Sequence, residues 1–210
     1  MGLDYRRSLI QGAKSWTRDR EIQQVVLLDR NRGLRITLRH YIGLSHHKFP
    51  EVAIEMEPRI DYLKSARGAY HAMLGIEHYL QQCGLEESLL HLLKLRVSQV
   101  NGCAYCIDMH WKDLRAAGES EQRLYGLDAW EESPYYTDRE RAAFAWAESV
   151  TNIQDGHVPD SVYEHVKKFF NDKELADLTL AVTAINSWNR LSIAARTVPG
   201  TYQPAKTQGA

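Results

Sequence analysis

Two apolar helix patterns meet at Asn101-Gly102, and this break constrains the fold more than any other feature of the chain. Before the break, leucine and valine recur at three- and four-residue spacing, which predicts a helix with a broad buried face. Glycine commonly follows the last residue of a helix, so a second helix is expected to begin directly after it. Because a pair of such helices needs further helices to cover it, the pattern predicts a compact, multi-helix, all-α fold.

Most of the remaining chain shows the same helical period. Thr137 with Glu140, and Asn171 with Glu174, have the spacing of a capping box at a helix start. No stretch shows sustained alternation between hairpin turns, and no glycine-rich phosphate loop is present. Neither a β-sheet nor a nucleotide or other cofactor is therefore expected. The expected helices cover about residues 66–82, 85–100, 103–117, 120–130, 137–150, 159–170 and 171–193.

Residues 1–55 differ from the rest in having weak periodicity. The short apolar run at Val25-Val26-Leu27-Leu28 is compatible with a strand or with a turn of helix, and its length does not decide between them. We expect this segment to be an N-terminal extension outside the main domain, which covers residues 56–198. Residues 199–210 are predicted to be a mobile tail, because Pro199-Gly200 ends the helical pattern.

Composition limits the partners and the compartment. The 26 Lys and Arg residues nearly balance the 27 Asp and Glu residues, so neither nucleic acid nor an anionic membrane surface is an expected partner. No apolar run is long enough for a transmembrane helix. Three cysteines without a signal region predict a reducing, cytoplasmic location, in which a structural disulfide is not expected.

The chemically informative motif follows the break directly. Cys103, Cys106 and His110 have helical spacing i, i+3 and i+7, which places them in one row. Two cysteines three residues apart on a helix have α-carbons about 5 Å apart, which is compatible with a reversible disulfide. The amide groups of a helix N-terminus also favour a thiolate, and a histidine one turn later can exchange a proton with the sulfur.

A Cys-x-x-Cys pair can also serve other chemistry. Covalent haem attachment requires a histidine directly after the second cysteine, where this chain has Ile107, and an iron–sulfur cluster requires more cysteines than the chain contains. A zinc site built from Cys103, Cys106, His110 and His91 has suitable ligands but a strained geometry, since three of them lie on two turns of one helix. Zinc therefore stays an alternative to redox chemistry.

The motif and several later segments together resemble the alkyl hydroperoxidase D-like branch of the carboxymuconolactone decarboxylase family. This resemblance implies an all-helical fold, assembly into trimers or hexamers, and a thiol pair in which Cys106 attacks a peroxide and Cys103 resolves the product. A hydroperoxide substrate and a thiol or dithiol reductant are the implied partners. The resemblance extends from about Met56 to Arg196 and rests on residues 95–110, Lys112-Asp113, residues 118–124, Ala129-Trp130, residues 140–143 and residues 184–191.

One position departs from the family pattern. Twelve residues before Cys103, where the family usually has a glutamate that begins a proton relay, this chain has His91. An imidazole titrates near neutral pH and can replace the carboxylate as a proton acceptor. Alternative functions are decarboxylation of a lactone acid, which does not depend on the cysteine pair, and a non-catalytic redox-sensing or zinc-binding role. Asn189 is expected in interhelical hydrogen bonds, and Arg190 either near the thiols or in a subunit contact.

Overall fold

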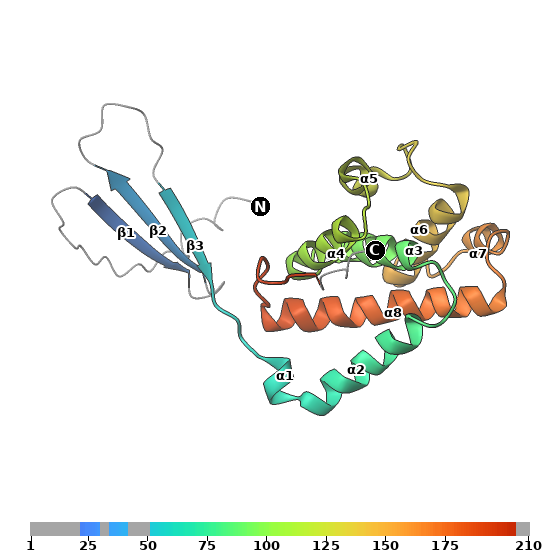
Figure 1. The fold of residues 1–210 in the computed structure, drawn as a ribbon, viewed down its shortest axis with the longest axis horizontal. Helices are drawn as coiled ribbons and strands as arrows, with labels where there is room; N and C mark the ends of the chain where they lie inside the picture. The colour runs from blue at the N-terminus through green and yellow to red at the C-terminus, as the bar shows by residue number, and fades with distance from the viewer. Residues whose placement is uncertain (1–21, 30–33, 42–50, 205–210) are drawn as a thin grey trace, which may run out of the picture. The chain divides into compact units, whose positions relative to one another are not determined.

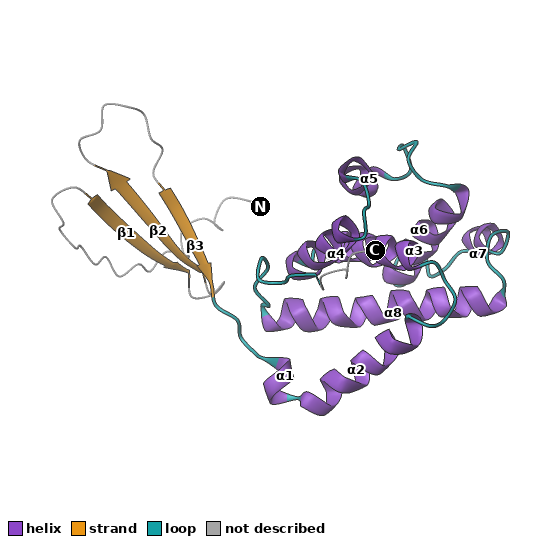
Figure 2. Ribbon diagram, viewed as in Figure 1, coloured by secondary structure: helices purple, strands orange, loops and turns teal. Residues whose placement is uncertain are grey.

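The computed structural model of the protein describes residues 22–29, 34–41 and 51–204. The chain divides into two units, residues 1–59 and residues 60–210. Figure 1 labels the elements of both units, and Figure 2 distinguishes helices from strands.

The N-terminal unit contains an antiparallel sheet of strands β1 (Ile22–Asp29), β2 (Leu34–Tyr41) and β3 (Glu51–Met56), in the order β1-β2-β3. In its register, Val25 is opposite Leu38 and Ile36 is opposite Ile54. The expectation that no segment would form a sheet is wrong here. The apolar run Val25-Val26-Leu27-Leu28 belongs to β1, and its backbone pairs with β2, which lies later in the chain.

The second unit confirms the mostly helical fold predicted from the sequence. Most helix boundaries agree with the predicted ones within a few residues. The largest differences are at the helices predicted for residues 120–130 and 159–170, because α5 ends at Gly126 and α7 ends at Val166. The helices are α1 (Tyr62–Ser65), α2 (Arg67–Leu80), α3 (Glu87–Asn101), α4 (Ala104–Ala116), α5 (Glu121–Gly126), the 3₁₀ turn η1 (Leu127–Ala129), α6 (Asp138–Thr151), α7 (Asp160–Val166) and α8 (Asp172–Ala195).

Both predicted capping boxes are present. The Thr137 hydroxyl accepts a hydrogen bond from the backbone N–H of Glu140, whose carboxylate accepts one from the backbone N–H of Thr137, at 3.2 and 2.8 Å. Asn171 and Glu174 repeat this exchange at the start of α8. Each cap satisfies amide groups that a helix start leaves free, which contributes about 1 kcal/mol to stability.

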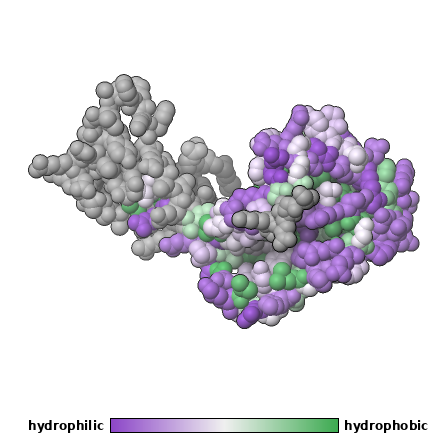
Figure 3. Space-filling model, in the orientation of Figure 1, coloured by the Kyte–Doolittle hydropathy of each residue, from purple (hydrophilic) through white to green (hydrophobic). Residues whose placement is uncertain are grey.

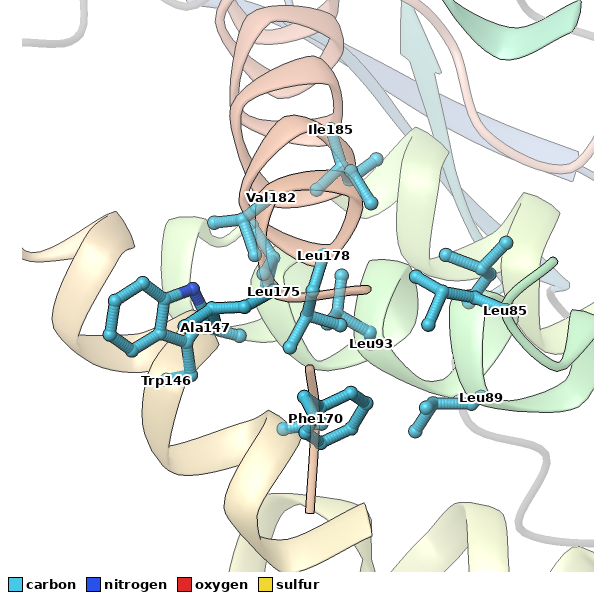
Figure 4. Close-up of a cluster of buried hydrophobic side chains, with 14 of the residues drawn as sticks. Leu85, Leu89, Leu93, Trp146, Ala147, Phe170, Leu175, Leu178, Val182 and Ile185 are labelled. Atoms are coloured by element: carbon cyan, nitrogen blue, oxygen red, sulfur yellow. The ribbon is translucent and has the colours of Figure 1, made fainter. Parts of the chain in front are cut away.

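Three helices that are distant in sequence form the main core. Leu93 of α3, Ala147 of α6 and Leu178 of α8 are fully buried in one apolar cluster, and Figure 4 shows side chains of these helices converging on it. A second cluster surrounds Phe144 of α6, whose ring packs edge-on against Trp130 and Tyr136. Helix α3 contributes to both clusters, so its C-terminal end, where the cysteine motif begins, is firmly positioned.

The surface of this unit is mostly hydrophilic, with apolar residues around α1 and α2 (Figure 3). Within the described part of the chain, no helix is both long and apolar enough to cross a membrane. The exposed large apolar side chains in or next to α1 and α2 are Ile60, Leu63, Leu74 and Tyr79.

Candidate functional site

The cysteine pair lies where α3 ends and α4 begins. Gly102 has left-handed backbone angles (φ 67°, ψ 33°) and ends α3, a conformation that residues with a side chain rarely adopt. Cys103 is the N-cap residue of α4, and Cys106 lies in the first turn of that helix. Both are free thiols and almost fully buried, with 1% and 2% exposure. The turn therefore presents two thiols at a helix N-terminus and shields both from bulk water.

The two thiols have unequal acidity because they share a hydrogen bond. The pKa of Cys103 is lowered from an ordinary value of 9.0 to about 7, mainly by the hydrogen bond from the Cys106 thiol and further by the backbone N–H of Cys106. The same contact raises the pKa of Cys106, with burial as the second cause. Polar side chains of α8, Asn189 and Ser192, lower the pKa of both thiols. At pH 7 about half of the pairs therefore carry a negative charge, and that charge is centred on Cys103.

This order of acidity qualifies the roles implied by the family resemblance. The resemblance assigns the attack on peroxide to Cys106, whereas the more acidic thiol is Cys103. Cys103 is the N-cap residue of α4, where the positive end of the helix dipole favours a thiolate. Attack by Cys106 therefore requires a base that removes its proton.

A network of amide side chains lies beneath the turn. Asn189, which is fully buried in α8, donates from Nδ2 to the Ser98 hydroxyl at 3.0 Å and accepts from Asn101 Nδ2 at 2.9 Å. Asn101 also donates to Asn186 Oδ1 at 3.0 Å, and Asn186 donates to the Thr151 hydroxyl at 3.0 Å. The interhelical role expected for Asn189 is present, and the network links α8 to the last turn of α3, directly before the cysteines.

His91 and His110 come together from two different helices. His91 lies on α3 and His110 on α4, with their ring centroids 6.1 Å apart and the rings at 61°. His110 is 5% exposed, and among the described residues neither of its ring nitrogens has a hydrogen-bond partner; the same is true of Nδ1 of His91. Burial is the main cause that lowers the pKa of both histidines, and the nearby Lys94 lowers both further. Both imidazoles are therefore neutral at pH 7 and available as proton acceptors.

Asp113 joins the two histidines, and the sequence analysis did not single it out. One ligand-type atom from each of His91, His110 and Asp113 lies within 4.8 Å of the other two. Asp113 is one helical turn after His110, so its helical spacing was a signal that could have identified it. This potential metal-binding group contains neither cysteine, in contrast to the alternative zinc site considered from the sequence.

The segment after α8 lies along α4. Lys112 Nζ donates to the Tyr202 carbonyl at 3.1 Å, the Tyr202 hydroxyl donates to Asp113 Oδ1 at 2.6 Å, and the backbone N–H of Gly200 donates to Asp108 Oδ2 at 3.0 Å. These residues belong to the stretch expected to be a mobile tail, and they are held on the helix that carries the candidate site. Residues 205–210 lie outside the described residues.

Arg190 is exposed on α8, where its guanidinium donates to the backbone and side-chain oxygens of Asn186. Trp188 packs edge-on against Tyr70 and donates from Nε1 to Glu77 at 2.9 Å. Both side chains thus have contacts that position helices. The polar groups beside the thiols come from Asn189 and Ser192 instead.

Comparison with known proteins relates this arrangement to a family. Residues 67–149 match the carboxymuconolactone decarboxylase family. The uncharacterized protein YdfG of Bacillus subtilis is 42% identical over 139 residues, which cover 66% of this chain and 95% of that protein. The crystal structure of a protein of unknown function from Agrobacterium tumefaciens, provisionally named as an antioxidant defence protein AhpD, is 41% identical with a TM-score of 0.68, and the match covers 70% of this chain and 100% of that one. The alkyl hydroperoxide reductase AhpD of Bradyrhizobium diazoefficiens is 44% identical over 41 residues, covering 20% of this chain and 22% of that protein.

Proposed function

Because the chain belongs to the carboxymuconolactone decarboxylase family, we propose that it is a thiol-dependent peroxidase of the alkyl hydroperoxidase D-like type. The observation that carries the proposal is the buried dithiol at the start of α4, in which the pKa of Cys103 is lowered to about 7. A peroxide-reducing pair needs one sulfur that attacks and a second within disulfide reach, and residues three apart at a helix start meet the second requirement.

In the proposed reaction, the sulfur of Cys106 attacks the terminal oxygen of a hydroperoxide and breaks the O–O bond. Cys106 becomes a sulfenic acid, and the alkoxide leaves and takes up a proton to form an alcohol. The Cys103 thiolate then attacks the sulfenic sulfur, which forms the disulfide and releases the oxygen as water. A thiol or dithiol reductant returns two electrons and two protons to the disulfide and restores the pair.

The two histidines supply the base that this attack requires. Cys106 keeps its proton at neutral pH because its hydrogen bond with Cys103 and its burial both raise its pKa. His110 follows Cys106 by four residues on the same helix face, and burial keeps its imidazole neutral, so it can accept the thiol proton as the S–O bond forms. His91, packed edge-on against His110, can pass the proton outward through its partly exposed ring.

The test is peroxide consumption by the full chain with dithiothreitol as a defined reductant. Cys106→Ser is expected to abolish turnover, whereas Cys103→Ser undergoes one oxidation and accumulates a sulfenic acid that a dimedone probe traps. Cys83→Ser is the matched control, because Cys83 lies outside the motif, and it should leave the rate unchanged. Trapping of sulfenic acid in Cys106→Ser and none in Cys103→Ser would reverse the two roles. Consumption no faster than that of the Cys103→Ser/Cys106→Ser double variant would refute the peroxidase.

The low pKa of Cys103 favours a second candidate, a dithiol reductase acting on disulfide substrates. Thiolates whose pKa is close to the ambient pH attack disulfides most efficiently, and Cys103 has a pKa of about 7. In this case Cys103 attacks, and Cys106 completes the intramolecular disulfide. Reduction of a model disulfide that is lost in Cys103→Ser, together with slow peroxide consumption by the unmodified chain, would favour the reductase.

We also propose that the protein acts as a homo-oligomer, a trimer or a hexamer. Exposed apolar side chains around α1 and α2 support this assembly, because they form a surface that gains free energy by contact with a second copy (Figure 3). Ile193 of α8 is a further exposed apolar residue of the helical unit.

A further inference from the structure

We propose that His91, His110 and Asp113 bind a divalent first-row transition-metal ion, and we take Zn²⁺ as the ion that tests the site. Side-chain atoms of the three residues lie within 4.8 Å of one another, although they come from two helices. Ligands around a tetrahedral Zn²⁺ are about 3.4 Å apart, given metal–ligand bonds of about 2.0–2.1 Å. Small rotations of three side chains would therefore complete the site without movement of α3 or α4.

The unpartnered histidine nitrogens indicate that this cluster lacks a binding partner. Buried polar side-chain atoms nearly always have a hydrogen bond, and leaving one without a partner costs about 1–3 kcal/mol. Among the described residues, however, His110 is buried with both ring nitrogens unpartnered, and Nδ1 of His91 is unpartnered too. A metal bond to one nitrogen of each ring would give a partner to Nδ1 of His91 and to one of the two His110 nitrogens.

Neighbouring side chains contact two of the three proposed ligands, Asp113 and His91. The Tyr202 hydroxyl holds Asp113 Oδ1 at 2.6 Å, which fixes the carboxylate and leaves Oδ2 for the metal. Glu87 Oε1 lies 3.8 Å from Nε2 of His91, which gives the far side of that ring a carboxylate neighbour if Nδ1 binds the metal. Hydrogen-bonded carboxylates and histidines with a carboxylate behind them are typical supports of metal ligands.

Lys94 is a nearby positive charge that opposes a cation here, since it lowers the pKa of both histidines. Its ammonium group is 2.5 Å from Glu77 Oε2 in a largely buried ion pair, which neutralises most of its effect on a metal ion. Two imidazoles and one carboxylate select Zn²⁺ and its first-row neighbours over Mg²⁺ and Ca²⁺, which prefer oxygen ligands. Three protein ligands leave one position of a tetrahedral ion for water or a small ligand.

A neutral imidazole that binds a metal through one nitrogen carries a hydrogen on the other, so it has no nitrogen left to accept a proton. A bound ion would therefore prevent His110 from accepting the Cys106 proton, and the metal-bound protein would be the inactive form. This consequence rests on the proposed peroxidase function, whereas metal binding does not depend on it. The closing experiment therefore measures binding directly and requires no turnover.

The experiment titrates Zn²⁺ by calorimetry into the full chain after treatment with a chelator. Replacement of all three cysteines by serine removes thiol ligands, and this variant is expected to bind one Zn²⁺ per chain. In the same background, His91→Ala and Asp113→Asn should weaken binding by about tenfold or more. His78→Ala is the matched control, because His78 is exposed on α2, and it should bind like the parent variant.

Cobalt substitution gives a second readout. Co²⁺ bound to this cluster should show the visible absorption of a nitrogen- and oxygen-ligated tetrahedral ion, without a thiolate charge-transfer band in the cysteine-containing protein. Circular dichroism of each variant checks that the helices are intact. Absence of Zn²⁺ binding in the cysteine-free chain, or equal affinities in His91→Ala, Asp113→Asn and His78→Ala, would overturn the site. So would a thiolate band in the cobalt spectrum.

Discussion

Removal of one thiol should shift the acidity of the other, and in opposite directions for the two cysteines. The pKa of Cys103 is lowered from 9.0 to about 7, and its largest cause is the hydrogen bond from the Cys106 thiol. In Cys106→Ala that donor is lost while the backbone N–H of residue 106 remains, so the pKa of Cys103 should rise toward its ordinary value. In Cys103→Ala, the pKa of Cys106 should fall, because its two contacts with Cys103 are among the causes that raise it.

The expected magnitude follows from the pKa of about 7. At pH 7 about half of the Cys103 thiol is ionised, compared with about one in a hundred for an unperturbed thiol of pKa 9. Because the pKa of the Cys103 thiol is lowered, the thiolate is already present above about pH 7, and it is lost as the pH falls through about 7. A rise of about one pKa unit in Cys106→Ala would leave about one Cys103 thiol in ten ionised at pH 7.

The assay is the ultraviolet absorbance of the thiolate, followed as a function of pH. A Cys83→Ser background restricts the signal to the pair, and circular dichroism at each pH checks that the protein stays folded. The same titration on Cys106→Ala and Cys103→Ala gives the two shifts. A midpoint of 9 or above in the starting protein, or an unchanged midpoint in Cys106→Ala, would refute the argument that the thiols set each other's acidity.

Four further predictions follow from the site and the surface. His91→Glu, which introduces the residue usual in the family, should keep or raise the peroxidase rate, and His91→Ala should lower it; equal rates in both variants would remove His91 from the relay. Asn189→Ala should reduce the free energy of unfolding by about 2–4 kcal/mol, measured by urea denaturation. The substitution removes the buried hydrogen bonds that Asn189 makes with Ser98 and Asn101 and leaves their polar groups without that partner. A chain that starts at Met56 should keep the melting temperature and oligomeric state of the full chain, and a large loss of stability would mean that the first unit packs on the second. Sedimentation should give the mass of a trimer or hexamer at micromolar concentration, and a monomer mass would contradict the proposed assembly.

Local signals in the sequence were sufficient for the helical unit. The capping boxes at Thr137 and Asn171 and the glycine at position 102 act within one turn of chain, so their effect does not depend on distant residues. The periodicity of apolar residues then identified which helices would be buried. For the same reason the sequence could place both cysteines at the start of a helix.

The sheet in the first unit depended on partners distant in sequence. Alternating residues are visible in β2, where Leu34, Ile36 and Leu38 lie between Arg35, Thr37 and Arg39. The neighbouring strand β1 contains a continuous apolar run, which has no period of its own. A strand becomes stable only when another strand pairs with its backbone, and this information is not present in any one segment.

The chemistry of the candidate site was determined only in part by sequence. Spacing along α4 placed Cys106, His110 and Asp113 on one face, because a helix brings every third or fourth residue together. The packing of α3 against α4 brought His91 to His110, and the packing of α8 placed Asn189 against the turn. Burial by these contacts keeps the histidines neutral, and the contact between the two thiols makes Cys103 the more acidic one. Acidity depends on desolvation and on neighbouring charges and hydrogen bonds, which are properties of the folded chain and are absent from residue spacing.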